Sequence, residues 1–248
     1  MILFFTLLFG LIFGSFANML SYRLPRDKTI AFDRSRCPIC NETLPAFSLI
    51  PVLSFILQRG KCHHCKAPIS WRYPLIEIMM AFSWILTYFY FGFSLQSVIG
   101  FLFLFLTIVL FVSDLETYLL PLSPMISLGL LGLFRAFIDQ NFKTHLYGLL
   151  VGFCVFFVLK IVARLFYKRE ALGSGDVLLS SALGLFLGWH SSLLFIYISF
   201  LLGGLVGIIV LVFTSKKSND TLPFGPILIA AASIVFFFGD RLWALLHI

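Results

Sequence analysis

Long apolar stretches, separated by short clusters of charged and turn-forming residues, dominate the pattern along this chain. Eight of them approach the ~20 residues that an α-helix needs to cross the hydrocarbon core of a membrane. The pattern therefore predicts an all-α polytopic membrane protein with about eight transmembrane helices. These run approximately over residues 1–22, 73–91, 95–113, 119–136, 145–163, 172–188, 191–213 and 222–246.

Two of the boundaries carry no charged residue and depend on glycine instead. The break at "FGFS" rests on Gly92 and on length, and the break at "GWHSS" rests on Gly188 and His190. The first stretch has neither a basic segment before it nor a small-residue cleavage site, so we interpret it as a retained helix and not as a signal peptide.

One long polar segment interrupts the apolar pattern between the first two helices. It predicts a division into a first transmembrane helix (1–22), a cytoplasmic domain (23–72) and a seven-helix membrane domain (73–248). Within the polar segment, "FSLIPVLSFIL" is apolar but too short to span a bilayer. It either lies along the membrane surface or packs under the rest of the segment.

Composition agrees with a membrane protein. The chain is 60% hydrophobic and 12% charged, whereas soluble domains are about 45–50% apolar and about 25% charged. Alternating the eight helices places 15 Lys and Arg on one side, and only Arg135, Lys143 and Arg241 on the other. The positive-inside rule then makes the basic side cytoplasmic and directs both termini outward. Basic loops beside anionic lipid account for the net charge of +7 without a nucleic-acid partner.

The polar segment contains two C-x-x-C knuckles about 20 residues apart. Four thiolates at this spacing can close a tetrahedral shell around Zn²⁺ and so fold a segment too small for a core of its own. Disulfides are the alternative, but the reducing cytoplasm disfavours them. The predicted zinc ligands are Cys37, Cys40, Cys62 and Cys65. We interpret His63 and His64 as solvated residues, and Cys154 as a packing residue.

Acidic side chains within or beside membrane spans are costly, so each one needs an explanation. Asp114 ends the third predicted helix and Asp176 begins the sixth, which places both at the cytoplasmic face. Glu77 lies at the start of the second helix, where the helix dipole favours an acid. Glu116 is a rival to Asp114, but it is two residues further along and points elsewhere from a helix.

Two carboxylates in a site of low dielectric constant share a proton, so one can accept a proton from water while the other polarises a peptide carbonyl. Gly173 and Gly175 would leave room for helices, and for a substrate backbone, to approach. Three other interpretations remain open at this point. The aspartates could be interfacial caps, they could be ion sites of an ion-coupled membrane transporter, or the chain could be an inactive zinc-stabilised scaffold.

The segment "LGSGDVLL" resembles the G-x-G-D motif of intramembrane aspartyl proteases, which include presenilin and the type IV prepilin peptidases. Five further segments resemble the second family in particular, and together they extend over essentially the whole chain in order. They are "GSFANMLSYRLP", the paired C-x-x-C knuckles, "WRYPLIEIMMA", "DLETYLLP" and "LPFGPILIAAA".

This resemblance implies an enzyme of the bacterial cytoplasmic membrane that removes the basic leader of prepilins, pseudopilins or competence pilins on the cytoplasmic side. Asp114 and Asp176 would be its catalytic aspartates, and water its nucleophile. Members of the family often methylate the new N-terminus with S-adenosylmethionine, although this chain has no glycine-rich fingerprint for that cofactor. It departs from many relatives at Leu178, where they have lysine, and at Leu122, where relatives often have a polar or acidic residue.

Overall fold

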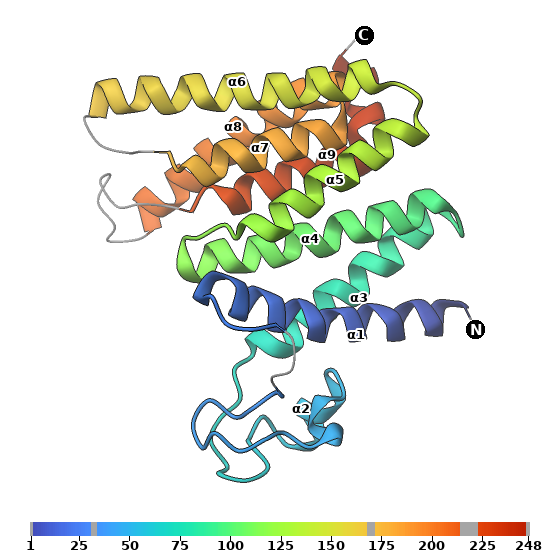
Figure 1. Cartoon of the computed structure of the whole chain (residues 1–248), viewed down its shortest axis with the longest axis vertical. Helices are drawn as coiled ribbons and strands as arrows, with labels where there is room; N and C mark the ends of the chain where they lie inside the picture. Colours follow the sequence, from blue (N-terminus) through green and yellow to red (C-terminus); the bar gives the residue numbers. More distant parts are fainter. Residues whose placement is uncertain (1, 31–33, 168–171, 214–222, 247–248) are drawn as a thin grey trace. The chain divides into compact units, whose positions relative to one another are not determined.

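A computed structural model describes residues 2–30, 34–167, 172–213 and 223–246 of the chain. These residues form α-helices, two short 3₁₀ helices and two isolated β-bridges, with no extended strand among them. The predicted all-α class is confirmed. A short α2 (Leu53–Leu57) lies between the first two long helices (Figure 1).

Eight long helices correspond one to one with the eight apolar stretches of the sequence. They are α1 (Ile2–Arg23), α3 (Arg72–Phe91), α4 (Leu95–Thr117), α5 (Leu122–Ile138), α6 (Phe142–Tyr167), α7 (Ser174–Leu187), α8 (Trp189–Phe213) and α9 (Gly225–Leu246). In the described part of the chain, six of them are long and apolar enough to cross a membrane, whereas α5 and α7 are shorter. The protein is therefore a multi-pass membrane protein.

Both glycine-dependent boundaries are found in the structure. Gly92 ends α3 with φ 65° and Gly188 ends α7 with φ 81°, in the left-handed region that side chains other than glycine rarely adopt. Each N–H bonds back to a carbonyl four residues earlier, which closes the helix. Both boundaries that no charge marks are thus confirmed, and a glycine ends the helix at each.

The chain forms two compact units, residues 1–109 and 110–248, with the boundary inside α4. In the first unit α1 packs along α3. The two backbones lie so close that a Cβ built on Gly10 would come within 2.5 Å of Ala81 Cα, and one built on Gly14 within 2.5 Å of Glu77 Cα. This packing requires glycine at both positions.

In the second unit α7 is the central helix and packs against α5, α6, α8 and α9 (Figure 1). From Val177 to Leu187 every residue of α7 except Leu178 is buried. Gly148 of α6 lies against the carbonyl of Gly184, and Gly152 lies against the carbonyl of Ser180. Because the partner number falls as the α6 number rises, α6 and α7 are antiparallel.

An arginine and a histidine side chain bond to C-terminal carbonyls of α7. Arg135 donates to the Phe186 carbonyl at 3.2 Å, and Nδ1 of His145 lies 2.7 Å from the Leu185 carbonyl, so that nitrogen is the donor. Both side chains also contact the Asp139 carboxylate, at 3.5 Å and 3.2 Å. Polar contacts therefore hold α5, α6 and α7 together at this end.

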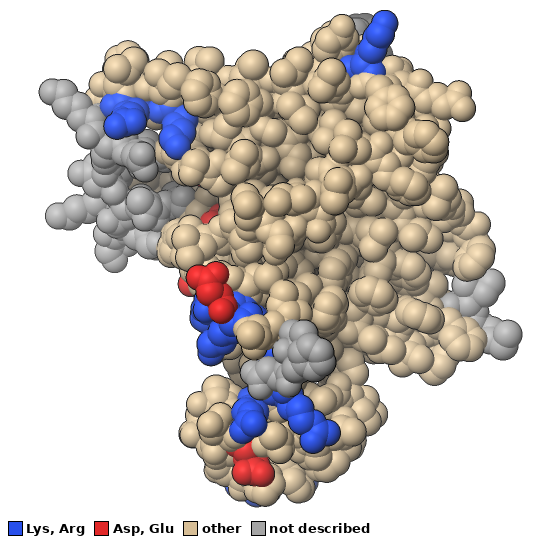
Figure 2. Space-filling view, in the orientation of Figure 1, with Lys and Arg blue, Asp and Glu red and all other residues tan. Residues whose placement is uncertain are grey.

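Charged side chains gather in few places. Figure 2 shows lysine and arginine on the segment between α1 and α3 and near the C-terminal end of α6, where Arg164 lies in the last turn. The helix surfaces visible between these places are almost free of charge. This distribution fits helices whose middle parts face lipid.

Candidate active site and metal site

Asp114 lies inside α4, which continues to Thr117, and it is 5% exposed. Its Oδ2 accepts a hydrogen bond from the backbone N–H of Gly225 at 3.1 Å. Gly225 is the first residue of α9, so this N–H has no partner within its own helix. The buried carboxylate thus caps the N-terminus of α9, where the helix dipole favours negative charge.

Asp176 lies in the first turn of α7 and is partly exposed. Its Oδ2 accepts a hydrogen bond from the backbone N–H of Gly173 at 3.2 Å. This is one half of a capping box, in which an acid at the third helical position bonds back to the residue that precedes the helix. Both aspartates therefore lie at helix N-termini.

A single leucine connects the two sites. Leu120, in the turn after α4, contacts the start of both helices: a Cβ built on Gly175 would lie 3.2 Å from its Cδ1, and one built on Gly225 would lie 3.4 Å from its Cδ2. Leu120 therefore lies against both helix starts, one capped by Asp176 and the other by Asp114. The structure thus places the two carboxylates that the sequence singled out at neighbouring helix ends.

The predicted glycines lie where a side chain would crowd this arrangement. A Cβ on Gly173 would be 3.2 Å from Asp176 Oδ2, and a Cβ on Gly175 would press on Leu120. The catalytic role of the aspartates and the shaping role of the glycines stay predictions. The interpretation of the aspartates as caps describes real contacts, and those contacts do not conflict with catalysis.

Two nearby positions point away from the pair. Glu116 is exposed on the same helix in which Asp114 is buried. Leu178 is 46% exposed on a helix whose neighbouring side chains are buried. Residues two apart on a helix differ by about 200° in direction, which explains both observations.

Three residues of the site were not singled out from the sequence. Gly225 and Leu120 lie within segments quoted for the resemblance, but only the fold shows their contacts with Asp114 and Gly175. Lys160 of α6 lies toward the start of α7, because the register set by Gly148 against Gly184 and Gly152 against Ser180 continues in that direction. The sequence could have indicated Lys160, because a lysine within an apolar helix is costly in lipid.

The four predicted zinc ligands converge on one point. Cys37, Cys40, Cys62 and Cys65 are free thiols whose sulfur atoms all lie within 4.8 Å of one another. The Sγ atoms of Cys37 and Cys65 are 3.9 Å apart. Four sulfurs at 2.3 Å around Zn²⁺ would be separated by about 3.8 Å, so the donor set fits this metal.

The two knuckles repeat the same backbone structure 25 positions apart. The N–H of Cys37 bonds to the Glu42 carbonyl and that of Cys62 to the Ala67 carbonyl, and a β-bridge closes each knuckle. The backbone N–H of Cys40 lowers the pKa of the Cys37 thiol to about 7. A thiol that ionises near neutral pH is a ready metal ligand.

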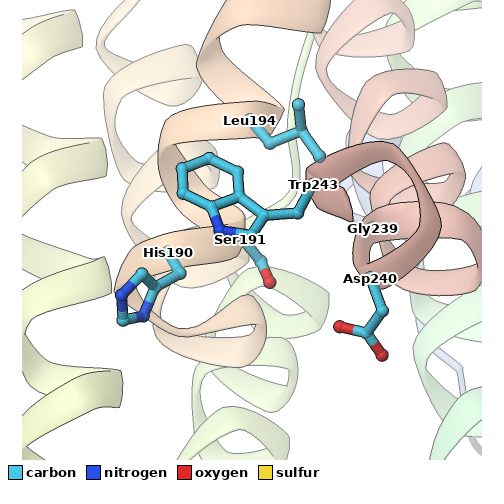
Figure 3. Close-up of a pocket in the computed structure, with 6 residues that line it drawn as sticks. All are labelled: His190, Ser191, Leu194, Gly239, Asp240 and Trp243. Carbon is cyan, nitrogen blue, oxygen red and sulfur yellow. The ribbon is translucent and has the colours of Figure 1, made fainter. Parts of the chain in front are cut away.

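A pocket of about 340 Å³ lies between α8 and α9 (Figure 3). His190 and Ser191 line it from the start of α8, and Asp240 and Trp243 from the end of α9. Asp240 follows Gly225 by 15 residues, about 22 Å along a helix axis. The pocket is therefore separate from the carboxylate pair.

Comparison with known proteins identifies two family models in the chain. Residues 8–91 match the bacterial Peptidase A24 N-terminal domain, and residues 100–208 match the type IV leader peptidase family. The first match contains the zinc knuckles, and the second contains both aspartates. No solved structure matches the chain.

Curated relatives extend this similarity over nearly the whole sequence. Proteins named prepilin leader peptidase/N-methyltransferase are 36% identical in Myxococcus xanthus (88% of this chain, 65% of the relative), 32% in Stutzerimonas stutzeri (96% and 91%) and 31% in Bacillus subtilis (95% and 94%). The chain thus spans about two thirds of the Myxococcus protein and nine tenths of the other two. The chain belongs to the type IV leader peptidase family.

Proposed function

We propose that this protein cleaves the basic leader peptide from type IV prepilins, pseudopilins or competence pilins, with Asp114 and Asp176 as its catalytic pair. The observation that carries the proposal is that each carboxylate caps a helix N-terminus, Asp114 that of α9 and Asp176 that of α7, and that Leu120 contacts both helix starts. The names of the relatives support prepilin as the substrate class. They give no support to the ion-coupled transporter.

The chemistry follows from the pair itself. Carboxylates close together titrate as a unit and share one proton. The ionised member accepts a proton from water as the water attacks the scissile carbonyl, and the protonated member donates to the carbonyl oxygen. Because water is the nucleophile, no covalent acyl-enzyme forms.

The proposed location is the bacterial cytoplasmic membrane, with the aspartates and the zinc knuckles at the cytoplasmic face and both termini outward. The excess of lysine and arginine on one side of the alternating helices supports this orientation. A basic leader, which anionic lipid and the membrane potential retain in the cytoplasm, would meet the pair there.

We also propose that the protein methylates the new N-terminus, as the relatives' names suggest. S-adenosylmethionine is the methyl donor that the resemblance implies. The described residues contain no β-strand and so build no Rossmann-type site for that cofactor. We therefore assign it no residues and derive no methylation step.

The direct test incubates the purified full-length protein with a prepilin and follows the shortened product by mass spectrometry. Asp114→Asn and Asp176→Asn should each abolish cleavage, since an amide cannot exchange the proton. Glu116→Gln, an equal change on the exposed side of α4, is the matched control and should leave most activity. Full cleavage by either aspartate variant would refute the mechanism, and an intact prepilin with the unmodified protein would refute the function.

A further inference from the structure

The stretch of chain that connects the two zinc knuckles carries an exposed apolar surface. It is formed by a 3₁₀ helix (Ala46–Leu49) and by α2, and its side chains are between 42% and 72% exposed. Within α2 the exposed residues occur at i, i+3 and i+4 and so form one face of the helix. We refer to these residues as the apolar loop surface: Phe47, Leu49, Ile50, Leu53, Ile56 and Leu57.

The other side of α2 already has its contacts. The ring of Phe55 packs against Trp71 with centroids 4.8 Å apart, and Gln58 donates to the Ser48 hydroxyl at 2.8 Å. The internal contacts of this segment are thus made by other side chains than those of the apolar loop surface. A contiguous patch of large apolar side chains that faces outward marks a surface for lipid or for another molecule.

The position of α2 along α3 is fixed by Glu77. Oε2 of this buried carboxylate accepts a hydrogen bond of 2.7 Å from the backbone N–H of Val52, which immediately precedes α2. Glu77 follows Arg72, the first residue of α3, by five positions, about 7.5 Å along the helix axis. The start of α2 therefore lies beside the first two turns of a membrane-spanning helix, and not beyond its end.

The backbone at this contact has an unusual conformation. Val52 has φ 59°, which is sterically costly for a β-branched residue and persists only where neighbours enforce it. Two contacts hold it: the N–H of Leu53 bonds to the Pro51 carbonyl across Val52, and the N–H of Val52 bonds to Glu77. A sterically costly residue therefore stands where α2 meets α3.

Charge and aromatic residues around the surface fit the head-group region of a bilayer. Arg59 and Lys61 follow α2 directly, and residues 23–72 contain nine Lys and Arg against three Asp and Glu. Trp71, which is 69% exposed, stands immediately before α3, and tryptophan is enriched at membrane interfaces. Leu75 and Ile78 continue the exposed apolar surface along α3.

We propose that the apolar loop surface lies in the membrane interface, in contact with the acyl chains of anionic phospholipids, and that Glu77 sets its depth. Amphipathic helices of this kind insert about 5–10 Å, which matches the level at which Val52 meets Glu77. Of the two placements that the sequence left open for this segment, the structure favours the membrane surface. The proposal requires only that α3 spans a membrane and is independent of the catalytic activity.

The test places the photo-crosslinking residue p-benzoylphenylalanine at Leu57 in the full-length protein, reconstituted in phosphatidylglycerol-containing vesicles. The matched control carries it at Glu42, an exposed polar position of the same segment. We expect phospholipid adducts at position 57, with or without prepilin present, at several times the yield found at position 42. Adducts to prepilin in place of lipid, or equal lipid yields at both positions, would overturn the proposal.

The role of Glu77 is tested in the same experiment. Glu77→Gln keeps an oxygen that can accept the Val52 N–H, whereas Glu77→Ala removes it. We expect the lipid adduct at position 57 to persist with Gln and to fall several-fold with Ala, while the zinc content of both variants stays at one per chain. An unchanged adduct in Glu77→Ala would show that Glu77 does not set the depth of α2.

Discussion

The contact between Gly225 and Asp114 provides a sharp test of the proposed active site. A Cβ built on Gly225 would lie 2.6 Å from Asp114 Oδ2, whereas ordinary contacts of this kind begin at 3.4 Å. Gly225→Ala must therefore displace the carboxylate oxygen by 3.4 − 2.6, or about 0.8 Å. That shift would lengthen the 3.1 Å hydrogen bond from the Gly225 N–H beyond the usual range.

Two independent estimates give similar values for the loss of cleavage rate in Gly225→Ala. A hydrogen bond to a charged group contributes about 1.5–3 kcal/mol, which corresponds to roughly 10- to 150-fold in rate if it is lost from the transition state. A misplacement of about 1 Å can cost about 100-fold through orientation alone. We therefore expect Gly225→Ala to lower the rate of leader cleavage by roughly 10- to 150-fold.

The assay is the initial rate of prepilin cleavage by reconstituted protein. Gly129→Ala is the matched control, because Gly129 also lies in a helix of the second unit and a Cβ there meets nothing within 4 Å. The control should cleave at close to the unmodified rate. If Gly225→Ala also stayed within about twofold, equivalent to about 0.4 kcal/mol, Asp114 would not depend on this contact and its placement here would be wrong.

Two further outcomes test other parts of the structure. Changing Cys37 and Cys62 to Ser should remove the one zinc expected per chain. The segment between α1 and α3 should then become sensitive to protease, since zinc binding supplies its folding energy. Elemental analysis that finds no metal in the unmodified protein would contradict this prediction. Leu178→Lys should change the cleavage rate by less than about tenfold and leave the pH profile almost unmoved, because the side chain points away from Asp176.

Much of the fold could be predicted because lipid imposes a simple rule on the sequence. Every backbone polar group in a span must be satisfied within its own helix, so apolar stretches translate directly into helices. The predicted boundaries at Gly92 and Gly188 were correct because glycine is suited to the left-handed residue that ends a helix. The zinc knuckles were predictable for a similar reason, since the spacing of the four thiols limits the shapes that their loops can adopt.

The contacts between helices could not be predicted in this way. Nothing in the sequence around Gly225 shows that its N–H bonds to a residue 111 positions earlier, because that pairing depends on how α9 packs beside the end of α4. The position of Lys160 near the start of α7 depends likewise on the antiparallel packing of α6 on α7. Short helices were harder to delimit: α7 has only 14 residues, whereas the apolar stretch that predicted it ran over residues 172–188.

The capping contacts of the two aspartates also determine which substitution is informative. An asparagine side chain keeps an oxygen that can accept the N–H of Gly225 or Gly173, so Asp114→Asn and Asp176→Asn preserve the caps while removing the titrating group. Alanine removes both, and loss of a cap costs about 0.5–2 kcal/mol of stability. If the carboxylates served only as caps, the Asn variants would cleave normally and only the Ala variants would fail. If they are catalytic, Asn and Ala lose cleavage alike and differ only in thermal stability, so comparing the two pairs separates the structural role from the chemical one.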